Sequence, residues 1–268
     1  MNNVTIILGG SADIGGFLVT KYLSLGHTVF TTCRNDQDKN KLISIGAKDV
    51  FKCDFSDYAS VEEFVNEFRQ SGYKWNNIIS SVGTMLPIGN FLNIDFKSWE
   101  INLKINSLSH LFLLNKIWKH RDTKRISNFG LLAGGGTNNA FKNYSAYCLS
   151  KIMLIKACEL LDDENEDLNI FIVGPGYVKT RIHNETLKNK DQAGENYHKT
   201  KSFLESQGTP LEDIFDSINW CIDNGKGLMS GRNLSTVGDK WKNKSDNLID
   251  DLKKDENLFK LRRKQNDK

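Results

Sequence analysis

The sequence contains little that would break, cross-link or divide a chain. Only three prolines occur in 268 residues, and no Pro- and Ser-rich linker separates one part from another. The five cysteines are an odd number without close pairs, which argues against a disulfide framework and a zinc site, and the five histidines lack metal-ligand spacing. We therefore expect one domain, without a metal, in a reducing compartment.

Membrane and nucleic-acid signals are also missing. No apolar run approaches the roughly 18 residues of a membrane span, and no charged and apolar leader precedes the first strand candidate at Val4. The net charge of +3 resides in the segment from Lys242 to Lys268, where nine basic residues oppose six acidic ones. The rest of the chain is neutral, which argues against a surface that follows nucleic-acid phosphates. We expect a cytoplasmic protein that binds neither membranes nor nucleic acid.

The chain has the composition and alternation of an α/β protein. Hydrophobic residues make up 39% and aromatic residues 10% of the sequence, enough to fill a core. Short apolar strand candidates alternate with helix candidates, which predicts a parallel, doubly wound sheet with ligands at the carboxyl ends of its strands. Residues 1–240 form this domain, and 241–268 form a charged tail with the pattern of an amphipathic helix. The predicted strands are 4–8, 27–33, 49–53, 77–81, 125–129, 169–173 and 232–237, and the main helices are 38–45, 58–71, 96–119 and 212–223, with the polar stretch 181–207 expected to lie over the site.

A glycine-rich turn, Gly9 to Gly16, follows the first strand and opens a helix. Backbone N–H groups and the positive helix end of such a turn can face a phosphate, which the glycines allow to approach, although an ordinary strand-to-helix turn has the same appearance. The second strand ends in Cys33 and Arg34, without the acidic residue that would bind a ribose 2′-hydroxyl. A guanidinium suits a 2′-phosphate, so this end favours NADP over NAD, unless Arg34 is simply a surface residue.

Tyr147 and Lys151 stand four residues apart, which puts both side chains on one face of a helix. A phenol titrates near ~10, and an ammonium one turn away stabilises its anion. The pair could therefore donate a proton to a carbonyl oxygen or remove one from an alcohol. The alternative is a solvated helix face, because Tyr197 and Lys201 repeat the spacing in a polar stretch.

With these motifs in this order, the chain from Val4 to about Thr180 resembles the short-chain dehydrogenase/reductases. The resemblance implies a Rossmann-type sheet of about seven strands, hydride transfer between NAD(P) and a carbonyl or secondary alcohol, a small-molecule substrate, and a homodimer or homotetramer. Tyr147 would be the acid/base, Lys151 would lower its pKa and hold the nicotinamide ribose, and Asn106 would anchor a water in the proton relay. The implied cofactor-binding residues are Gly9, Ser11, Ala12, Asp13, Ile14, Gly15, Arg34, Asp54, Phe55, Ser81, Val82, Gly83, Lys151, Pro175, Gly176, Val178 and Thr180.

The sequence departs from the family pattern at four places. Leu8 replaces a Thr, and Asp13 replaces a Gly, where an acidic residue suits the start of a helix. Ser81 replaces an Asn, which we expect to loosen the packing of the central strand. No Ser occurs between Ser127 and Ser145, where the family has its catalytic Ser, and losing such a donor costs on the order of 10²–10³ in rate. Thr137, or the backbone N–H groups of Gly134 to Gly136, could take its place.

Three short segments are similar to family members encoded among polysaccharide-biosynthesis proteins, which suggests a sugar or sugar-nucleotide substrate. They are the Gly-Gly-Gly-Thr run, Ser230 to Ser235, and Leu258 to Arg263. The alternative from another class is a dinucleotide-binding protein without efficient chemistry, acting as a sensor or scaffold, and the missing Ser is the feature that favours it.

Overall fold

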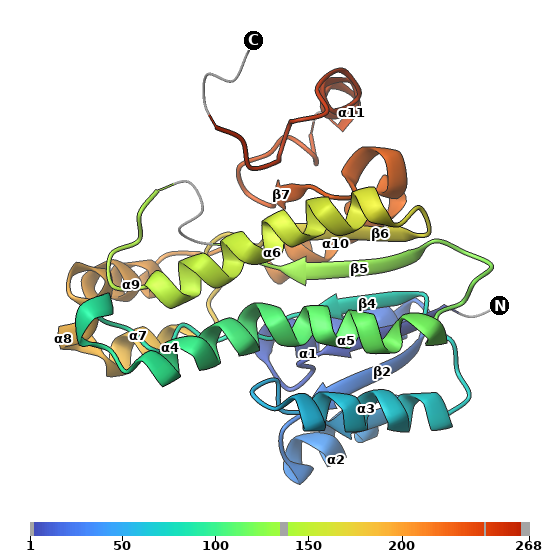
Figure 1. Ribbon diagram of the computed structural model, residues 1–268, viewed down its shortest axis with the longest axis horizontal. Coiled ribbons are helices and arrows are strands. Elements are labelled where there is room, and N and C mark those ends of the chain that lie inside the picture. Colours follow the sequence, from blue (N-terminus) through green and yellow to red (C-terminus); the bar gives the residue numbers. More distant parts are fainter. Residues whose placement is uncertain (1–2, 135–138, 244, 264–268) are drawn as a thin grey trace.

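Seven parallel strands form one sheet in the computed structural model, which describes residues 3–134, 139–243 and 245–263 (Figure 1). The order β3-β2-β1-β4-β5-β6-β7 reverses direction between β1 and β4, as in a doubly wound Rossmann-type sheet. The predicted fold is therefore confirmed. The strands are β1 (Val4–Leu8), β2 (Thr28–Cys33), β3 (Asp49–Lys52), β4 (Asn77–Ser80), β5 (Ser127–Leu132), β6 (Leu168–Gly174) and β7 (Asn233–Ser235).

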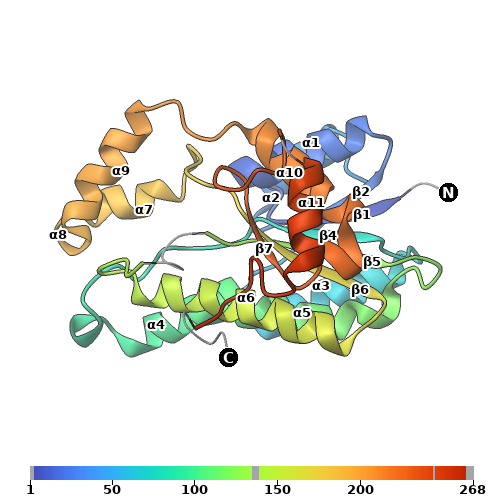
Figure 2. The ribbon, with the colours of Figure 1, turned by 90° about the horizontal axis from the view of Figure 1, so that it is seen from above.

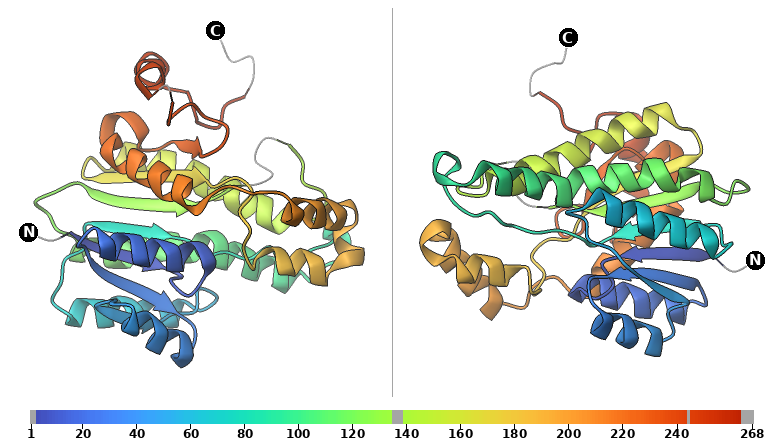
Figure 3. Two further views of the ribbon diagram at one scale, coloured as in Figure 1. Left: turned by 180° about the vertical axis from the view of Figure 1, so that it is seen from behind. Right: turned by 60° about the horizontal axis from the view of Figure 1, so that its bottom comes forward.

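Helices cover both faces of the sheet, because the central strands are apolar on both sides. In β1, Ile6 packs into the core on one face and Ile7 into the core on the other. Figure 3 shows the helices of the first face side by side, and Figure 2 shows those of the second. The first face carries α3 (Tyr58–Gln70), α5 (Ser109–Ile117) and α6 (Ser145–Glu164), and the second carries α1 (Asp13–Ser24), α2 (Asp36–Ser44), α10 (Leu211–Asp223) and α11 (Ser245–Lys254).

The remaining helices lie toward the carboxyl ends of the strands. The predicted helix 96–119 is continuous but irregular: α4 (Phe96–Leu103) passes through a π-helical turn (Lys104–Leu108) into α5 and ends in a 3₁₀ turn (Trp118–His120). The polar stretch 181–207 folds into α7 (His183–Lys188), α8 (Lys190–Ala193) and α9 (Glu195–Glu205), which stand beyond the sheet (Figure 1). Within the described ranges, no helix is both long and apolar enough to cross a membrane.

The predicted boundary of β5 was wrong. We expected 125–129, but the strand runs from Ser127 to Leu132 and includes Gly130. A Cβ at Gly130 would lie 2.8 Å from the Phe171 ring of the neighbouring strand, so the close packing of that ring requires a residue without a side chain. The strand β5 consequently continues through Gly130, although glycine usually weakens a strand. The loop after β5 begins three residues later than expected.

The segment after Lys240 packs onto the body of the protein. Trp241, Leu248 and Leu252 belong to the core on the second face. The buried Arg232 guanidinium donates to three carbonyl oxygens, of Leu252 at 3.2 Å, Asp255 at 3.1 Å and Leu258 at 2.7 Å. Leu252 lies in the last turn of α11 (Ser245–Lys254), and Asp255 and Leu258 follow it, so one arginine next to β7 satisfies carbonyl groups at the C-terminus of that helix.

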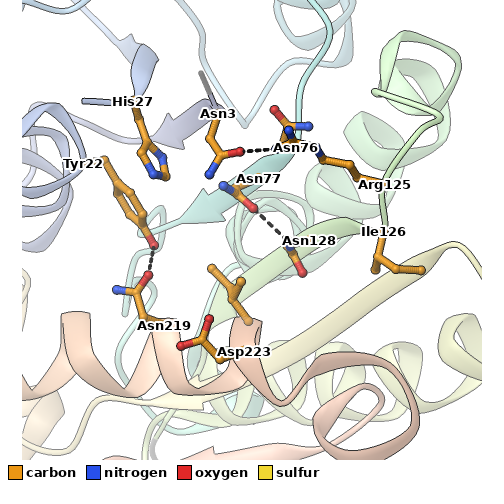
Figure 4. Close-up of a pocket in the computed structure, with 11 residues that line it drawn as sticks. Asn3, Tyr22, His27, Asn76, Asn77, Arg125, Ile126, Asn128, Asn219 and Asp223 are labelled. Atoms are coloured by element: carbon orange, nitrogen blue, oxygen red, sulfur yellow. Dashed lines mark hydrogen bonds between the residues drawn. The ribbon is translucent and has the colours of Figure 1, made fainter. Parts of the chain in front are cut away.

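A polar ladder crosses the sheet near the amino ends of its strands, and Figure 4 shows its step between Asn128 and Asn77. The Nδ2 group of Asn169 donates to Asn128 at 2.7 Å, that of Asn128 to Asn77 at 2.8 Å, and that of Asn77 to the Thr5 hydroxyl at 3.1 Å. These residues are register partners on adjacent strands, so the ladder fixes the alignment of four strands at once. The cavity of about 310 Å³ beside this ladder lies at the amino edge of the sheet. The functional residues are predicted at the opposite, carboxyl edge.

Candidate active site

The glycine turn is shaped by close contacts. Gly9 has a φ of +82°, and its N–H donates to the Thr32 hydroxyl at 2.9 Å. A Cβ at Gly15 would lie 2.1 Å from the Gly9 carbonyl oxygen, so only glycine lets α1 begin this close to the turn. Ser11, Ala12, Asp13 and Ile14 then present the first turn of α1 at the carboxyl edge of the sheet. Because no side chain caps this helix end, its first N–H groups can serve an anion.

Ser81, which we expect to loosen the packing of the central strand, makes contacts that connect this strand to the glycine turn. Its hydroxyl lies 3.0 Å from the Leu8 carbonyl and 3.3 Å from the Gly9 carbonyl, and thus joins β4 to the glycine turn. A Cβ at Gly15 would also meet this hydroxyl at 2.6 Å. A small side chain fits the narrow space between strand and turn, and the hydroxyl satisfies a carbonyl there.

Tyr147 and Lys151 lie together near the start of α6. Lys151 is 4% exposed, its Nζ donates to the Leu132 carbonyl at 3.2 Å, and it lies 5.7 Å from the centre of the Tyr147 ring. The Tyr147 ring packs beside the cluster of Ile88, Tyr144 and Cys148 and remains partly accessible to solvent. The predicted pair therefore exists, with the amine held under the end of β5.

The pKa of Tyr147 moves in the direction opposite to our prediction. Crowding by surrounding atoms raises the pKa of the phenol above its usual value, and the nearby Glu185 carboxylate adds to this. Burial lowers the pKa of Lys151 to about 8, which still leaves most of the amine charged at pH 7. The Lys151 amine lies beside the ring, but burial of the phenol is the main influence on the pKa of Tyr147.

Asn106 lies in the π-helical turn between α4 and α5, where it is fully buried. Its Oδ1 accepts from the Thr84 N–H at 2.8 Å, and its Nδ2 lies within 3.1 Å of the Thr84 carbonyl, Asn102 Oδ1 and the Ser150 hydroxyl. These partners occupy both N–H groups of the amide and one lone pair of its oxygen, so the predicted role in holding a water stays a prediction. Asn106 instead connects the loop after β4 to α6.

Gly83 lies beside two of the three predicted catalytic residues. A Cβ there would lie 3.3 Å from Asn106 Oδ1 and 3.5 Å from Lys151 Nζ. The neighbouring Val82 donates its N–H to the Ser80 hydroxyl at 3.3 Å. The loop after β4 therefore passes close to Asn106 and Lys151 at the carboxyl edge.

Asp54 and Phe55, two predicted cofactor-binding residues after β3, differ in which of their atoms a ligand can reach. Asp54 is exposed, and its carboxylate accepts from the N–H and hydroxyl of Ser56. Phe55 is 4% exposed, and its carbonyl accepts from the Ser109 hydroxyl at 2.6 Å. The Phe55 side chain is thus part of the core, and only its backbone can meet a ligand.

The loop after β6 closes the other side of the site. Gly176 has a φ of +72°, Val178 is buried, and Thr180 precedes α7. A Cβ at Gly134 would lie 3.5 Å from Pro175 Cδ, which places the loop after β5 against this loop. Thr137, proposed as a substitute for the missing Ser, falls outside the described residues, as do Gly135 and Gly136.

Sequence reasoning missed Glu185 of α7. Its carboxylate accepts from the Thr84 hydroxyl at 3.0 Å and from the Met85 N–H at 2.6 Å, and burial raises its pKa. The hydrogen bonds from Met85 and Thr84, and to a smaller extent the Arg34 guanidinium, act in the opposite direction and lower this pKa. Nothing in the local pattern distinguishes Glu185, because its partners lie about a hundred residues away in the chain.

The arrangement suits a dinucleotide. The glycine turn at Gly9 opens the uncapped end of α1, the loop at Gly176 follows β6, and Tyr147 and Lys151 lie on α6. A family model described as enoyl-(acyl carrier protein) reductase matches residues 10–237. The chain belongs to the short-chain dehydrogenase/reductase family. It is an NAD(P)-dependent oxidoreductase of that family.

The relatives of this short-chain dehydrogenase/reductase are distant. An uncharacterized oxidoreductase of Saccharomyces cerevisiae is 23% identical over 207 residues, covering 76% of this chain and 81% of that protein. A benzil reductase ((S)-benzoin forming) of the same yeast is 24% identical, covering 69% and 75%. Among solved structures, a yeast short-chain dehydrogenase/reductase has a TM-score of 0.79 at 21% identity, covering 89% and 97%. An actinorhodin polyketide ketoreductase with NADPH has a TM-score of 0.76 at 15% identity, covering 88% and 96%.

Proposed function

We propose that this protein is an NADP-preferring carbonyl reductase in which Tyr147 is the proton donor. The observation that carries the proposal is the position of the Lys151 amine, buried beneath the loop after β4, beside the Tyr147 ring and against the Leu132 carbonyl. Lysine side chains are rarely buried unless they have a structural or functional role. In this proposal the charge of Lys151 acts on the neighbouring Tyr147 phenol.

The protonation states are compatible with reduction. The Tyr147 phenol carries its proton at neutral pH, as a phenol ordinarily does, and can donate it to an oxygen that gains negative charge. The Lys151 ammonium then stabilises the phenolate, and its pKa of about 8 keeps it charged at pH 7. NAD(P)H bound along the carboxyl edge supplies the hydride. Asn106 holds the Thr84 loop and α6 in fixed positions around the pair.

The preference for NADP rests on Arg34. It follows the last residue of β2, where a dinucleotide presents its adenine ribose, and no acidic residue occupies the end of that strand. We expect Arg34→Ala to weaken NADPH binding about 10- to 100-fold, the loss of a charged hydrogen bond, and to leave NADH binding nearly unchanged. Equal losses for the two cofactors, measured by fluorescence titration, would refute the role.

The proposed substrate region is flanked by two partly exposed aromatic side chains near the start of α6, Phe141 and Tyr147. They cluster with Ile88, Met85 and the fully buried Tyr144, on which Phe141 stacks. Aromatic faces of this kind can pack against a flat ring or against the apolar face of a sugar. The sequence similarity to polysaccharide-biosynthesis proteins favours a ketose or sugar nucleotide, and the names of two relatives add aromatic diketones to the candidates. The donor replacing the family's Ser would come from Gly134 to Thr137.

Turnover by the native protein and by Tyr147→Phe tests the function. With NADPH and a panel of ketoses, sugar nucleotides and benzil, we expect oxidation of NADPH by at least one substrate. Tyr147→Phe should lower kcat by on the order of 10²-fold or more, since it removes the general acid. Tyr73→Phe, at the far end of α3, is the matched control and should retain full activity. NADPH binding without turnover of any substrate would favour the sensor or scaffold alternative.

A further inference from the structure

An ion pair spans the two loops that the proposed function assigns to the cofactor. The Arg181 backbone N–H donates to Asp13 Oδ2 at 2.6 Å, and its Nε donates to Asp13 Oδ1 at 3.1 Å. Its Nη2 group also donates to the Ser11 carbonyl. Asp13 is the first residue of α1, and Arg181 lies between β6 and α7, directly after Thr180. The contact therefore joins segments 168 residues apart at the opening of the glycine turn.

Asp13 creates an electrostatic problem at this position. A carboxylate at the start of a helix is stabilised by the same positive helix end that attracts a phosphate. A pyrophosphate at the glycine turn would therefore meet a negative side chain where the family pattern has glycine. Without a neighbouring cation, Asp13 would repel the ligand that the turn is shaped to bind.

Arg181 supplies a cation next to the Asp13 carboxylate. Its side chain is 66% exposed at the opening of the turn, whereas that of Asp13 is 33% exposed. The guanidinium contacts the turn through Nε and Nη2, and among the described residues no partner of Nη1 is found. One edge of the planar Arg181 guanidinium group is thus held by Asp13 and Ser11. The other edge remains open to bind an anion.

We propose that Arg181 binds the pyrophosphate of the dinucleotide and that Asp13 is the residue that positions it. This inference rests on the proposed function, because it presupposes that the glycine turn holds a dinucleotide. Asp13 and Arg181 act as a unit: the carboxylate orients the guanidinium, and the guanidinium removes the carboxylate's repulsion. The acidic residue in the glycine turn is tolerated because the loop after β6 supplies its counter-charge.

The test compares Arg181→Ala with the native protein by fluorescence titration with NADPH and, separately, with NADH. We expect both cofactors to bind about 10- to 100-fold more weakly, because the pyrophosphate is common to the two. This separates Arg181 from Arg34, whose replacement should affect NADPH alone. Arg69→Ala, which removes one exposed positive charge from α3, is the matched control and should bind both cofactors like the native protein.

The pairing with Asp13 is tested by repeating the measurement in the Asp13→Gly protein. There Arg181→Ala should cost clearly less than in the native background, since the repulsion between Asp13 and the pyrophosphate no longer adds to the lost contact. The same loss in both backgrounds would overturn the pairing, and unchanged affinity of Arg181→Ala for both cofactors would overturn the phosphate contact. If Arg181→Ala does not fold, Arg181→Lys, which keeps the charge but loses the fork, should show a smaller loss in the same direction. Native protein that binds neither cofactor would refute the proposed function itself.

Discussion

His110 should make the protein lose stability in mildly acidic solution. It lies on α5, 1% exposed, with Nε2 2.7 Å from the Ser80 hydroxyl and its ring 4.9 Å from that of Phe55. Burial, followed by the charge of Lys151, lowers its pKa from the usual 6.5 to about 3. In the folded protein the imidazole therefore stays neutral where the unfolded chain takes up a proton.

The pKa of His110 in the unfolded and in the folded protein determines the sign and the size of the change in stability. Because the folded protein binds fewer protons, stability is complete above pH 6.5 and is lost as the pH falls from 6.5 toward 3. Each pH unit in this window costs about 1.4 kcal/mol, so lowering the pH from 7 to 5 costs about 2 kcal/mol through this group alone. The neighbouring Lys151 opposes protonation of His110 further, since both would be cations.

Urea denaturation followed by circular dichroism at pH 7, 6 and 5 measures this contribution when His110→Gln is compared with the native protein. The glutamine keeps a polar partner for Ser80 but does not titrate. Other groups contribute equally to both proteins, so the native protein should lose about 2 kcal/mol more than the variant between pH 7 and 5. The same loss in both would show that His110 is protonated in the fold, and the reasoning would be refuted.

Three further changes test the contacts described above. Arg232→Ala removes the donors to three carbonyls at the C-terminal end of α11 and should lower the free energy of unfolding by about 3 kcal/mol. Arg262→Ala, which breaks a surface ion pair with Glu159, should cost about 1 kcal/mol or less in the same urea titration. Gly15→Ala should abolish NADPH binding, because its Cβ would lie 2.1 Å from the Gly9 carbonyl oxygen; native affinity in titration would contradict this. Asn106→Ala should lower the melting temperature and kcat together, with little change in KM, since it releases the Thr84 loop from α6, and a change in KM alone would argue against this role.

Local patterns predicted those features that depend on residues close together in the chain. The glycine turn and the Tyr147–Lys151 spacing were readable because one turn of backbone determines each of them. The pKa of Tyr147 was not, because it depends on how tightly remote residues crowd the ring and on Glu185 of α7. The end of β5 was missed for a similar reason: Gly130 breaks a strand in the sequence but accommodates the Phe171 ring in the sheet.

The departures from the family pattern show why a single position is a poor guide to function. Ser81 looked like a weakened packing residue, yet its hydroxyl satisfies the carbonyls of the turn that it faces. Asp13 looked acceptable for its helix position alone, yet its carboxylate is matched by Arg181 far along the chain. In both cases the meaning of the substitution depends on the group in contact with it. A missing catalytic Ser is therefore evidence against catalysis only after the residues that face the Tyr147 hydroxyl have been shown to provide no other donor, and turnover that depends on Tyr147 would demonstrate such a donor directly.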